Sequence, residues 1–291
     1  MSASGQLTSE ISYFPAEGGD ITTHKPQDFD MRRSVGVDDM SSQRTATVIR
    51  DARQADDIGL DTSGFQLIRR PSCVTNFMDA QEVMSVYYSE CKDLAKELTG
   101  ASIVYTYDHL IREPGRQISG GGTDGQTRVT DGAAGGGYIG LAHMDYTTNT
   151  TWSDYLGIHK ECPPESPTRT ISLNFWRGLS PLIDDFPLAV CDARSVQETD
   201  LFEVNVYGYG ASNYSWHDIG IETYSIKFSK EQRWFYYPHM KPEEVLVLKA
   251  YDSAGVIGNT CPHAAFSNPS ADPDSPARRS IELRVLCFIT D

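Results

Sequence analysis

The chain of 291 residues has no long apolar run and little positive charge. No segment approaches the roughly 18 apolar residues of a membrane-spanning helix, and residues 1–15 lack the basic start and apolar stretch of a secretory signal. Its 25 lysines and arginines are outnumbered by 40 aspartates and glutamates, so the formal net charge is −15. Acidic chains without a basic patch do not suit nucleic acid or anionic membranes. We expect a cytoplasmic protein with no membrane span and no nucleic-acid partner.

The six cysteines are scattered, and no two of them form a Cys-x-x-Cys pair. They are Cys73, Cys91, Cys162, Cys191, Cys261 and Cys287. In a cytoplasmic chain this pattern predicts reduced thiols rather than a zinc knuckle or a disulfide framework. The sequence does not fix the oligomeric state, and a homodimer is among the states left open.

No internal repeat or long linker divides the chain, so we expect a single domain over residues 1–291. Residues 1–40 are polar and punctuated by Gly and Pro, and they are expected to wrap the surface. Residues 41–100 are expected to supply a first strand, over 45–49, and a buttressing helix. Residues 101–291 are expected to form the core of strands.

The segment Asp79–Leu98 has the pattern of an amphipathic helix. Asp79 followed by Glu82 resembles a capping box, and Gly100 is a typical helix terminator. The apolar residues of the segment fall on one stripe and are Val83, Val86, Tyr87, Cys91, Leu94 and Leu98. A helix with one apolar stripe is expected to pack against the outer face of a sheet.

Short strands separated by turn residues dominate from residue 102 onward. They are expected over 102–107, 169–177, 203–207, 222–228, 234–237, 245–251 and 279–288. The Gly-rich stretch 115–137 is not the Gly-x-Gly-x-x-Gly of a nucleotide-binding fold, and reads equally as a mobile lid or an insertion. One helical group followed by many antiparallel-type strands predicts a mainly β fold with buttressing helices, a double-stranded β-helix or cupin-like jelly-roll barrel.

Two short pieces far apart in the chain carry the chemistry. His143 and Asp145 lie two apart on an extended segment, so both side chains can face one ion. With the distant His263 they make a 2-His-1-carboxylate set, which holds Fe(II) on one face and leaves positions open for substrates and O₂. Taken alone, His263 also fits a buried histidine satisfied by backbone. His217, in a polar and aromatic loop, is the competing third ligand.

The last strand has one polar and one apolar face. Arg278, Ser280, Glu282 and Arg284 share the first, and Ile281, Leu283, Val285 and Cys287 share the second. Inside a barrel, two arginines on one face would be costly unless an anion were bound there. A guanidinium fork beside a hydroxyl suits the far carboxylate of 2-oxoglutarate. Arg278 is the first choice for that role; Arg284 is the second, and equally a partner for Glu282.

A second polar position is expected on the strand 169–177. Strand parity places Asn174 and Trp176 on one face and Arg177 on the other. Asn174 is a candidate to hydrogen-bond the C1 carboxylate of 2-oxoglutarate or a metal ligand. A core tryptophan with an outward arginine explains the same pattern without any ligand.

Eight pieces of the chain, taken together and in order, resemble the AsaB/CmcJ-type family of non-haem iron dioxygenases, which includes fungal hydroxylase/desaturases. The pieces are 64–67, 143–147, 174–177, 187–192, 234–238, 251–253, 262–266 and 278–284. The resemblance implies iron at His143, Asp145 and His263, with 2-oxoglutarate and O₂ as co-substrates. It departs at Arg279, where an acidic residue is expected.

The resemblance leaves the substrate open. The expected reaction is oxidation of an unactivated C–H bond of a small apolar natural product, for example a terpenoid or meroterpenoid intermediate of secondary metabolism. Hydroxylation, desaturation and endoperoxide formation are all compatible with it. The stretches 115–137 and 65–70 are candidates to close over such a substrate. The alternatives are a metal-dependent cupin-like oxidase, hydrolase or isomerase that does not use 2-oxoglutarate, and a binding barrel without a metal.

Overall fold

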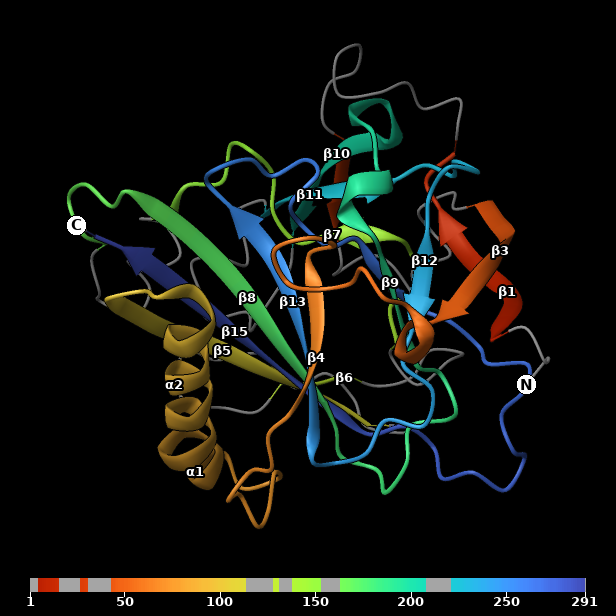
Figure 1. Cartoon of the computed structure of the whole chain (residues 1–291), viewed down its shortest axis with the longest axis horizontal. Helices are drawn as coiled ribbons and strands as arrows, with labels where there is room; N and C mark the ends of the chain where they lie inside the picture. Colours follow the sequence, from red (N-terminus) through yellow and green to blue (C-terminus); the bar gives the residue numbers. More distant parts are fainter. Residues whose placement is uncertain are drawn as a thin grey trace.

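Two curled β-sheets face one another and carry a helix on one outer side (Figure 1). The structure, a computed structural model, describes residues 5–15, 27–30, 43–113, 128–130, 138–152, 163–207 and 221–290. Within these ranges no helix is long and apolar enough to cross a membrane.

The six-stranded sheet is antiparallel except at one edge, where β5 and β6 run parallel. Its order is β4 (Phe65–Arg69), β13 (Glu244–Asp252), β8 (Arg169–Gly178), β15 (Ser280–Ile289), β5 (Ile103–Arg112) and β6 (Arg128–Thr130). The central strands β13, β8 and β15 are buried along nearly their whole length, so both faces of this sheet are covered.

The nine-stranded sheet is built largely from shorter strands. Its order is β1 (Gln6–Tyr13), β3 (Gln43–Asp51), β12 (Trp234–Tyr236), β9 (Leu188–Cys191), β14 (His263–Ala265), β7 (His143–Met144), β11 (Ile221–Ile226), β10 (Leu201–Tyr207) and β2 (Gln27–Asp30). Short helical turns follow β3 and β9, at η3 (Ala52–Gln54), η5 (Ala193–Ser195) and η6 (Glu198–Asp200). The N-terminal strands β1 and β2 therefore lie at the two edges, and β9, β14 and β7 come together at the centre from distant parts of the sequence.

The alternation along β15 separates two cores, as the polar and apolar pattern predicts. Ile281, Leu283, Val285 and Cys287 pack in one cluster with the helix residues Val83, Tyr87, Cys91 and Leu94. Leu286 and Phe288 belong to another cluster, which includes residues of the nine-stranded sheet such as Met144 and Tyr224. The even-numbered side chains of β15 therefore face the interior between the two sheets.

The helix follows the predicted span, divided into α1 (Ala80–Glu82), a π-helical turn η4 (Val83–Tyr87) and α2 (Tyr88–Thr99). Asp79 caps it by accepting from the backbone N–H of Gln81 and Glu82. The capping-box expectation for Glu82 was wrong: its carboxylate accepts from Thr75 and from the Asn76 amide instead. Gly100 ends the helix at φ 69°, in the left-handed region, as predicted.

Each strand expected from residue 102 onward is present, and the first of them extends to residue 112. Two features differ from expectation, and a third expectation is not tested. Residues 65–70 do not form a closing segment, because β4 pairs with β13 and Phe65 is fully buried. The N-terminal segment does more than wrap the surface, since β1 joins the nine-stranded sheet and buries Ile11 and Tyr13. Most of the stretch 115–137 lies outside the described residues, apart from β6.

Candidate metal centre

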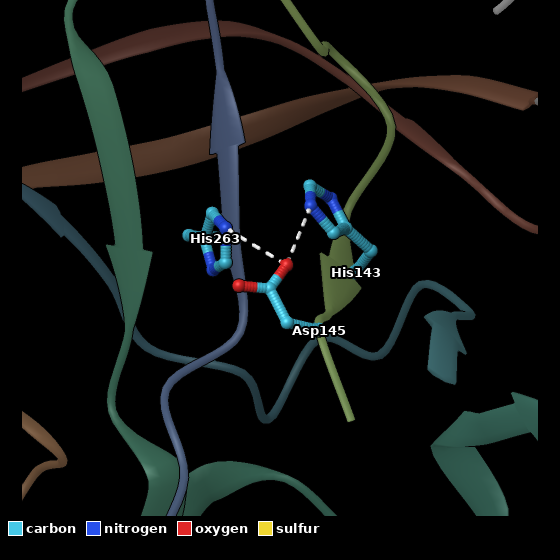
Figure 2. A group of neighbouring side chains, drawn as sticks. All are labelled: His143, Asp145 and His263. Atoms are coloured by element: carbon cyan, nitrogen blue, oxygen red, sulfur yellow. Dashed lines mark ion pairs between the residues drawn. The ribbon is translucent and has the colours of Figure 1, made fainter. Parts of the chain in front are cut away.

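The order of strands in the nine-stranded sheet brings the three predicted ligands together. Strand β7 pairs with β14, and His143 and His263 are direct register partners. Asp145 follows β7 by one residue and turns its carboxylate to the same side (Figure 2). One ligand atom of each residue lies within 4.8 Å of the others. The sequence therefore folds so that residues 120 positions apart form one facial set.

Both imidazoles are oriented by backbone carbonyls. Nδ1 of His143 lies 2.7 Å from the carbonyl oxygen of Leu141, and Nδ1 of His263 lies 3.2 Å from that of Cys261. A proton on each Nδ1 leaves Nε2 as the free lone pair. The two Nε2 atoms lie 3.5 Å and 3.9 Å from Oδ1 of Asp145. The donor atoms are therefore Nε2, Nε2 and a carboxylate oxygen, a set that suits Fe(II).

The electrostatics of the pocket keep this donor set ready for a cation. Burial, followed by the proximity of His143, lowers the pKa of His263 and so favours its neutral form. Burial raises the pKa of Asp145, but the neighbouring His143, His263 and Arg284 outweigh it, and the net pKa is lowered. Neutral imidazole and ionised carboxylate are the forms that bind metals.

Asn174 on β8 reaches across from the opposite sheet to hold the carboxylate. Its Nδ2 donates to Oδ2 of Asp145 at 2.5 Å, which leaves Oδ1 of Asp145 as the metal-facing oxygen. Of the two roles predicted for Asn174, the structure shows the contact with a predicted metal ligand, Asp145. Oδ1 of Asn174 is buried with no hydrogen-bond partner among the described residues, so it can accept from a donor that enters the site.

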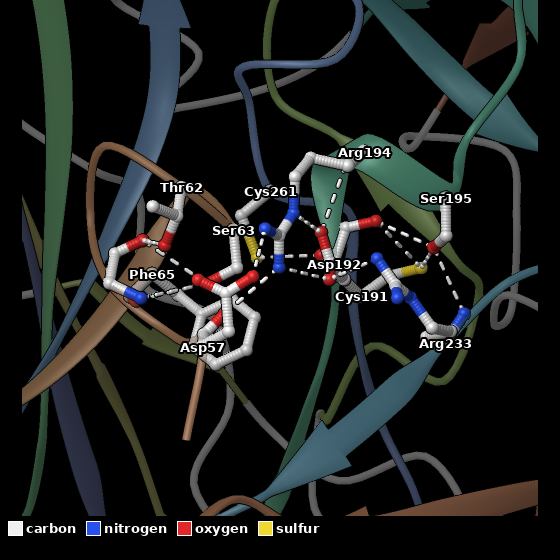
Figure 3. A network of polar contacts seen from close by, with 11 residues as sticks. Asp57, Thr62, Ser63, Phe65, Cys191, Asp192, Arg194, Ser195, Arg233 and Cys261 are labelled. Atoms are coloured by element: carbon white, nitrogen blue, oxygen red, sulfur yellow. Dashed lines mark hydrogen bonds and ion pairs between the residues drawn. The ribbon is translucent and has the colours of Figure 1, made fainter. Parts of the chain in front are cut away.

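A network of polar contacts surrounds the buried carboxylate of Asp192, directly after β9 (Figure 3). The carboxylate of Asp192 accepts from Nε of Arg194 at 3.0 Å and from Nη2 of Arg233 at 2.7 Å. The next residue back, Cys191, donates its backbone N–H to Pro262 at 2.8 Å. Because Pro262 joins Cys261 to His263, this network holds the carbonyl that orients the imidazole.

Arg278 lies in the interior with only about 1% of its surface exposed. Its Nε donates to Oγ of Ser280 at 3.3 Å and its Nη1 donates to the carbonyl of Phe186 at 2.5 Å. The guanidinium carbon lies 4.2 Å from the ring centroid of Tyr138 and 5.1 Å from that of Trp176. Two rings and two oxygens therefore surround this side chain.

No carboxylate of the described residues forms an ion pair with Arg278, and no acceptor there bonds its Nη2. Burial, and then repulsion from Arg112, lowers the pKa of Arg278 to about 9. Arg112 is itself buried, and it is the register partner of Ser280 on β5. A buried guanidinium whose charge is only partly neutralised can bind an anion, and the Ser280 hydroxyl can donate its proton to the same anion. This end of the interior therefore suits a carboxylate.

The remaining predicted residues fall into three cases. Arg284 donates to Oε1 of Glu282 at 2.7 Å. This ion pair is the alternative to anion binding that the sequence predicted for Arg284. Arg279, the departure from the family pattern, pairs with Glu113 at 2.9 Å on the outer side. His217 lies outside the described residues. The sequence did not point to Arg112, Phe186 or Tyr138, because each meets Arg278 only through the tertiary fold.

Comparison with known proteins agrees with this geometry. The model of a family described as oxidoreductase/YMDC permease-like domain matches residues 12–288. The hydroxylase/desaturase efuI of Hormonema carpetanum is 34% identical over 272 residues, which are 89% of this chain and 88% of that protein. The chain belongs to the AsaB/CmcJ-type family of non-haem iron hydroxylase/desaturases.

A further relative and its solved structure agree with this result in sequence and in fold. The Fe(II)/2-oxoglutarate-dependent dioxygenase nvfI of Aspergillus novofumigatus is 28% identical over 248 residues, covering 82% of this chain and 81% of that protein. A solved structure of the iron and alpha-ketoglutarate-dependent endoperoxidase NvfI covers 100% of both chains with a TM-score of 0.75 at 23% identity. That similarity confirms the predicted jelly-roll fold.

Family membership decides between the expected activities. The protein is an oxidoreductase, an oxygenase that depends on Fe(II), 2-oxoglutarate and O₂. The alternative of a cupin-like hydrolase or isomerase is not supported. The His-Asp-His cluster and the buried Arg278 are chemically suited to that metal and that co-substrate.

Proposed function

We propose that this chain oxidises an unactivated C–H bond of a small apolar intermediate of secondary metabolism, with Fe(II) held by His143, Asp145 and His263. The observation that carries the assignment is the convergence of these three donors within 4.8 Å. Relatives named hydroxylase/desaturase and endoperoxidase support oxidation at carbon.

The co-substrate would lie along the interior face of β15. Arg278 and Ser280 would bind the C5 carboxylate of 2-oxoglutarate, because they are the donors at the cationic end of the interior. The 2-oxo acid end would reach the metal, close to Asn174 and Arg284, which face each other across β8 and β15. Glu282 lies between the two ends and is neutralised by Arg284.

The other end of the interior is apolar and supports an apolar substrate. Beyond Arg284 the interior face of β15 continues with Leu286 and Phe288. Tyr105 of β5 is partly exposed and lies edge-on to Phe288, with ring centroids 6.1 Å apart. An apolar molecule held there would approach the metal from the side opposite to Arg278.

When bound, iron supplies the oxidising chemistry together with O₂ and 2-oxoglutarate. The protein's own contribution is orientation. His143 and His263 present fixed Nε2 atoms, Asn174 holds Asp145 so that one oxygen faces the metal, and Arg278 fixes the far end of the 2-oxo acid before the reaction begins.

The test is an anaerobic titration of the protein with Fe(II) and 2-oxoglutarate, following the weak visible metal-to-ligand charge-transfer band. We expect a band in the wild type, no metal binding in His263→Ala, and bound Fe(II) with a band only at much higher 2-oxoglutarate in Arg278→Ala. Fe(II) binding without any band would contradict the use of 2-oxoglutarate. An unchanged titration in Arg278→Ala would move the anchor to another residue.

A further inference from the structure

Two aromatic rings and two hydrogen-bond acceptors hold the Arg278 side chain. The ring of Tyr138 lies 4.2 Å from its guanidinium carbon and that of Trp176 lies 5.1 Å away. Nε and Nη1 are both engaged, by Ser280 and by the carbonyl of Phe186. Such contacts remove the rotational freedom that a long side chain otherwise keeps.

Phe186 adopts an unusual backbone conformation at this contact. Its φ is 43°, in the left-handed region that non-glycine residues rarely occupy. Only one other described non-glycine residue, His239, has a positive φ. Such a conformation costs free energy and persists when its surroundings enforce it. Here the carbonyl of Phe186 accepts from Nη1 of Arg278 at 2.5 Å, so the unusual residue directly contacts the anchor.

Tyr138 connects the parts of this cage. Its hydroxyl donates to the backbone carbonyl of Arg278 at 2.5 Å, while its ring covers the guanidinium of the same residue. The ring also contacts Phe186, with centroids 5.2 Å apart. Tyr138 therefore touches both ends of Arg278 and the residue that bonds Nη1.

We propose that Tyr138 and Phe186 are positioning residues that fix the distance between the Arg278 guanidinium and the metal ligands, and thereby select the chain length of the 2-oxo diacid. This inference rests on the proposed role of Arg278 as the anchor. A fixed guanidinium can bind the far carboxylate only at one distance from the metal. Because the enzyme depends on 2-oxoglutarate, this distance would suit a five-carbon diacid, and it would leave the four-carbon oxaloacetate too short and the six-carbon 2-oxoadipate too long.

The experiment compares these three diacids in the anaerobic Fe(II) titration, with the affinity of each measured from the charge-transfer band. The variants are Tyr138→Leu, which removes the ring and the hydroxyl, Tyr138→Phe, which keeps the ring, and Phe186→Gly, which relieves the positive φ. Tyr237→Leu is the matched control, because the Tyr237 ring covers a different arginine. The guanidinium carbon of Arg53 lies 5.8 Å from its ring centroid. Iron affinity is measured separately for each protein.

We expect the preference for 2-oxoglutarate over 2-oxoadipate to fall about tenfold in Tyr138→Leu, to fall less in Tyr138→Phe and Phe186→Gly, and to stay unchanged in Tyr237→Leu. Iron affinity should be unchanged throughout. A preference that is the same in the wild type, Tyr138→Leu and Phe186→Gly would overturn the inference while leaving the anchor intact. A wild type with no band for any diacid would instead remove the proposed function, and this inference with it.

Discussion

The side-chain amide of Asn174 donates to Oδ2 of Asp145 at 2.5 Å and so joins the two sheets at the metal centre. Asn174 belongs to the six-stranded sheet and Asp145 follows a strand of the nine-stranded sheet. The bond assigns different roles to the two carboxylate oxygens, because only Oδ1 remains directed at the imidazoles. Contacts of this kind tune a metal site without touching the metal.

The first prediction concerns this bond. Asn174→Ala should weaken Fe(II) binding by about 10- to 100-fold, because the carboxylate loses the donor that orients it. Competition with a chromophoric chelator under anaerobic conditions measures the change. Asn205→Ala is a matched control, since Asn205 donates to Asp28 at 3.0 Å on an exposed strand pair. Equal iron affinity in the wild type and Asn174→Ala would show that the bond does not position Asp145.

The second prediction distinguishes the two candidate histidines. His263→Ala should lose iron binding and activity, because Nε2 of His263 is one of the three converging donors. His217→Ala should keep the bound metal. Metal content after anaerobic loading and desalting gives the answer directly. Loss of iron in His217→Ala, with retention in His263→Ala, would reassign the third ligand.

The third prediction is a pH dependence of stability at Asp252. This fully buried carboxylate accepts from Nε of Arg169 at 2.8 Å and lies 3.4 Å from the buried Nζ of Lys249. Burial raises the pKa of Asp252, but these partners and the Ala254 amide outweigh it and lower the net pKa. Its contribution is therefore complete above the unfolded pKa of about 3.9 and is lost as the pH falls through the lower folded value.

Asp252→Asn should accordingly cost about 3 kcal/mol of unfolding free energy at neutral pH, because Lys249 would lose a buried partner. The difference from the wild type should shrink as the pH falls below about 3.9, because the unfolded chain then binds a proton at Asp252 while the folded carboxylate still resists protonation. Urea unfolding at pH 7 and at pH 3 tests this. A difference that is the same at both pH values would mean that the Asp252 charge does not stabilise the fold.

The fourth prediction concerns Arg279, the position that departs from the family pattern. Arg279→Glu should cost about 0.5–1 kcal/mol of stability, because it replaces the ion pair with Glu113 by two like charges. The double exchange Arg279→Glu with Glu113→Arg should restore most of the loss. Thermal unfolding of the wild type, Arg279→Glu, Glu113→Arg and the double variant completes a double-mutant cycle. Iron binding should not change in any of them, and a loss in Arg279→Glu would connect this residue to the site.

The sequence by itself determined the helix, most of the longer strands and the chemical type of the site. The period-two pattern of residues 279–288 fixed which side chains of β15 face the interior, because alternate residues of a strand point to opposite sides. Asp79 and Gly100 fixed the ends of the helix through local backbone chemistry. The spacing of His143 and Asp145 predicted two ligands on one side of the chain, again because alternate residues of an extended segment point the same way.

The tertiary structure decided what these residues meet. His263 joins His143 only because β14 and β7 are neighbours in a sheet whose order does not follow the sequence. Asn174 contacts Asp145 across the two sheets, and Arg284 pairs with Glu282. The cage around Arg278 combines Tyr138, Trp176 and Phe186 from three separate segments. Local patterns carry no information on such long-range partners, since these depend on which strands pair and in which register.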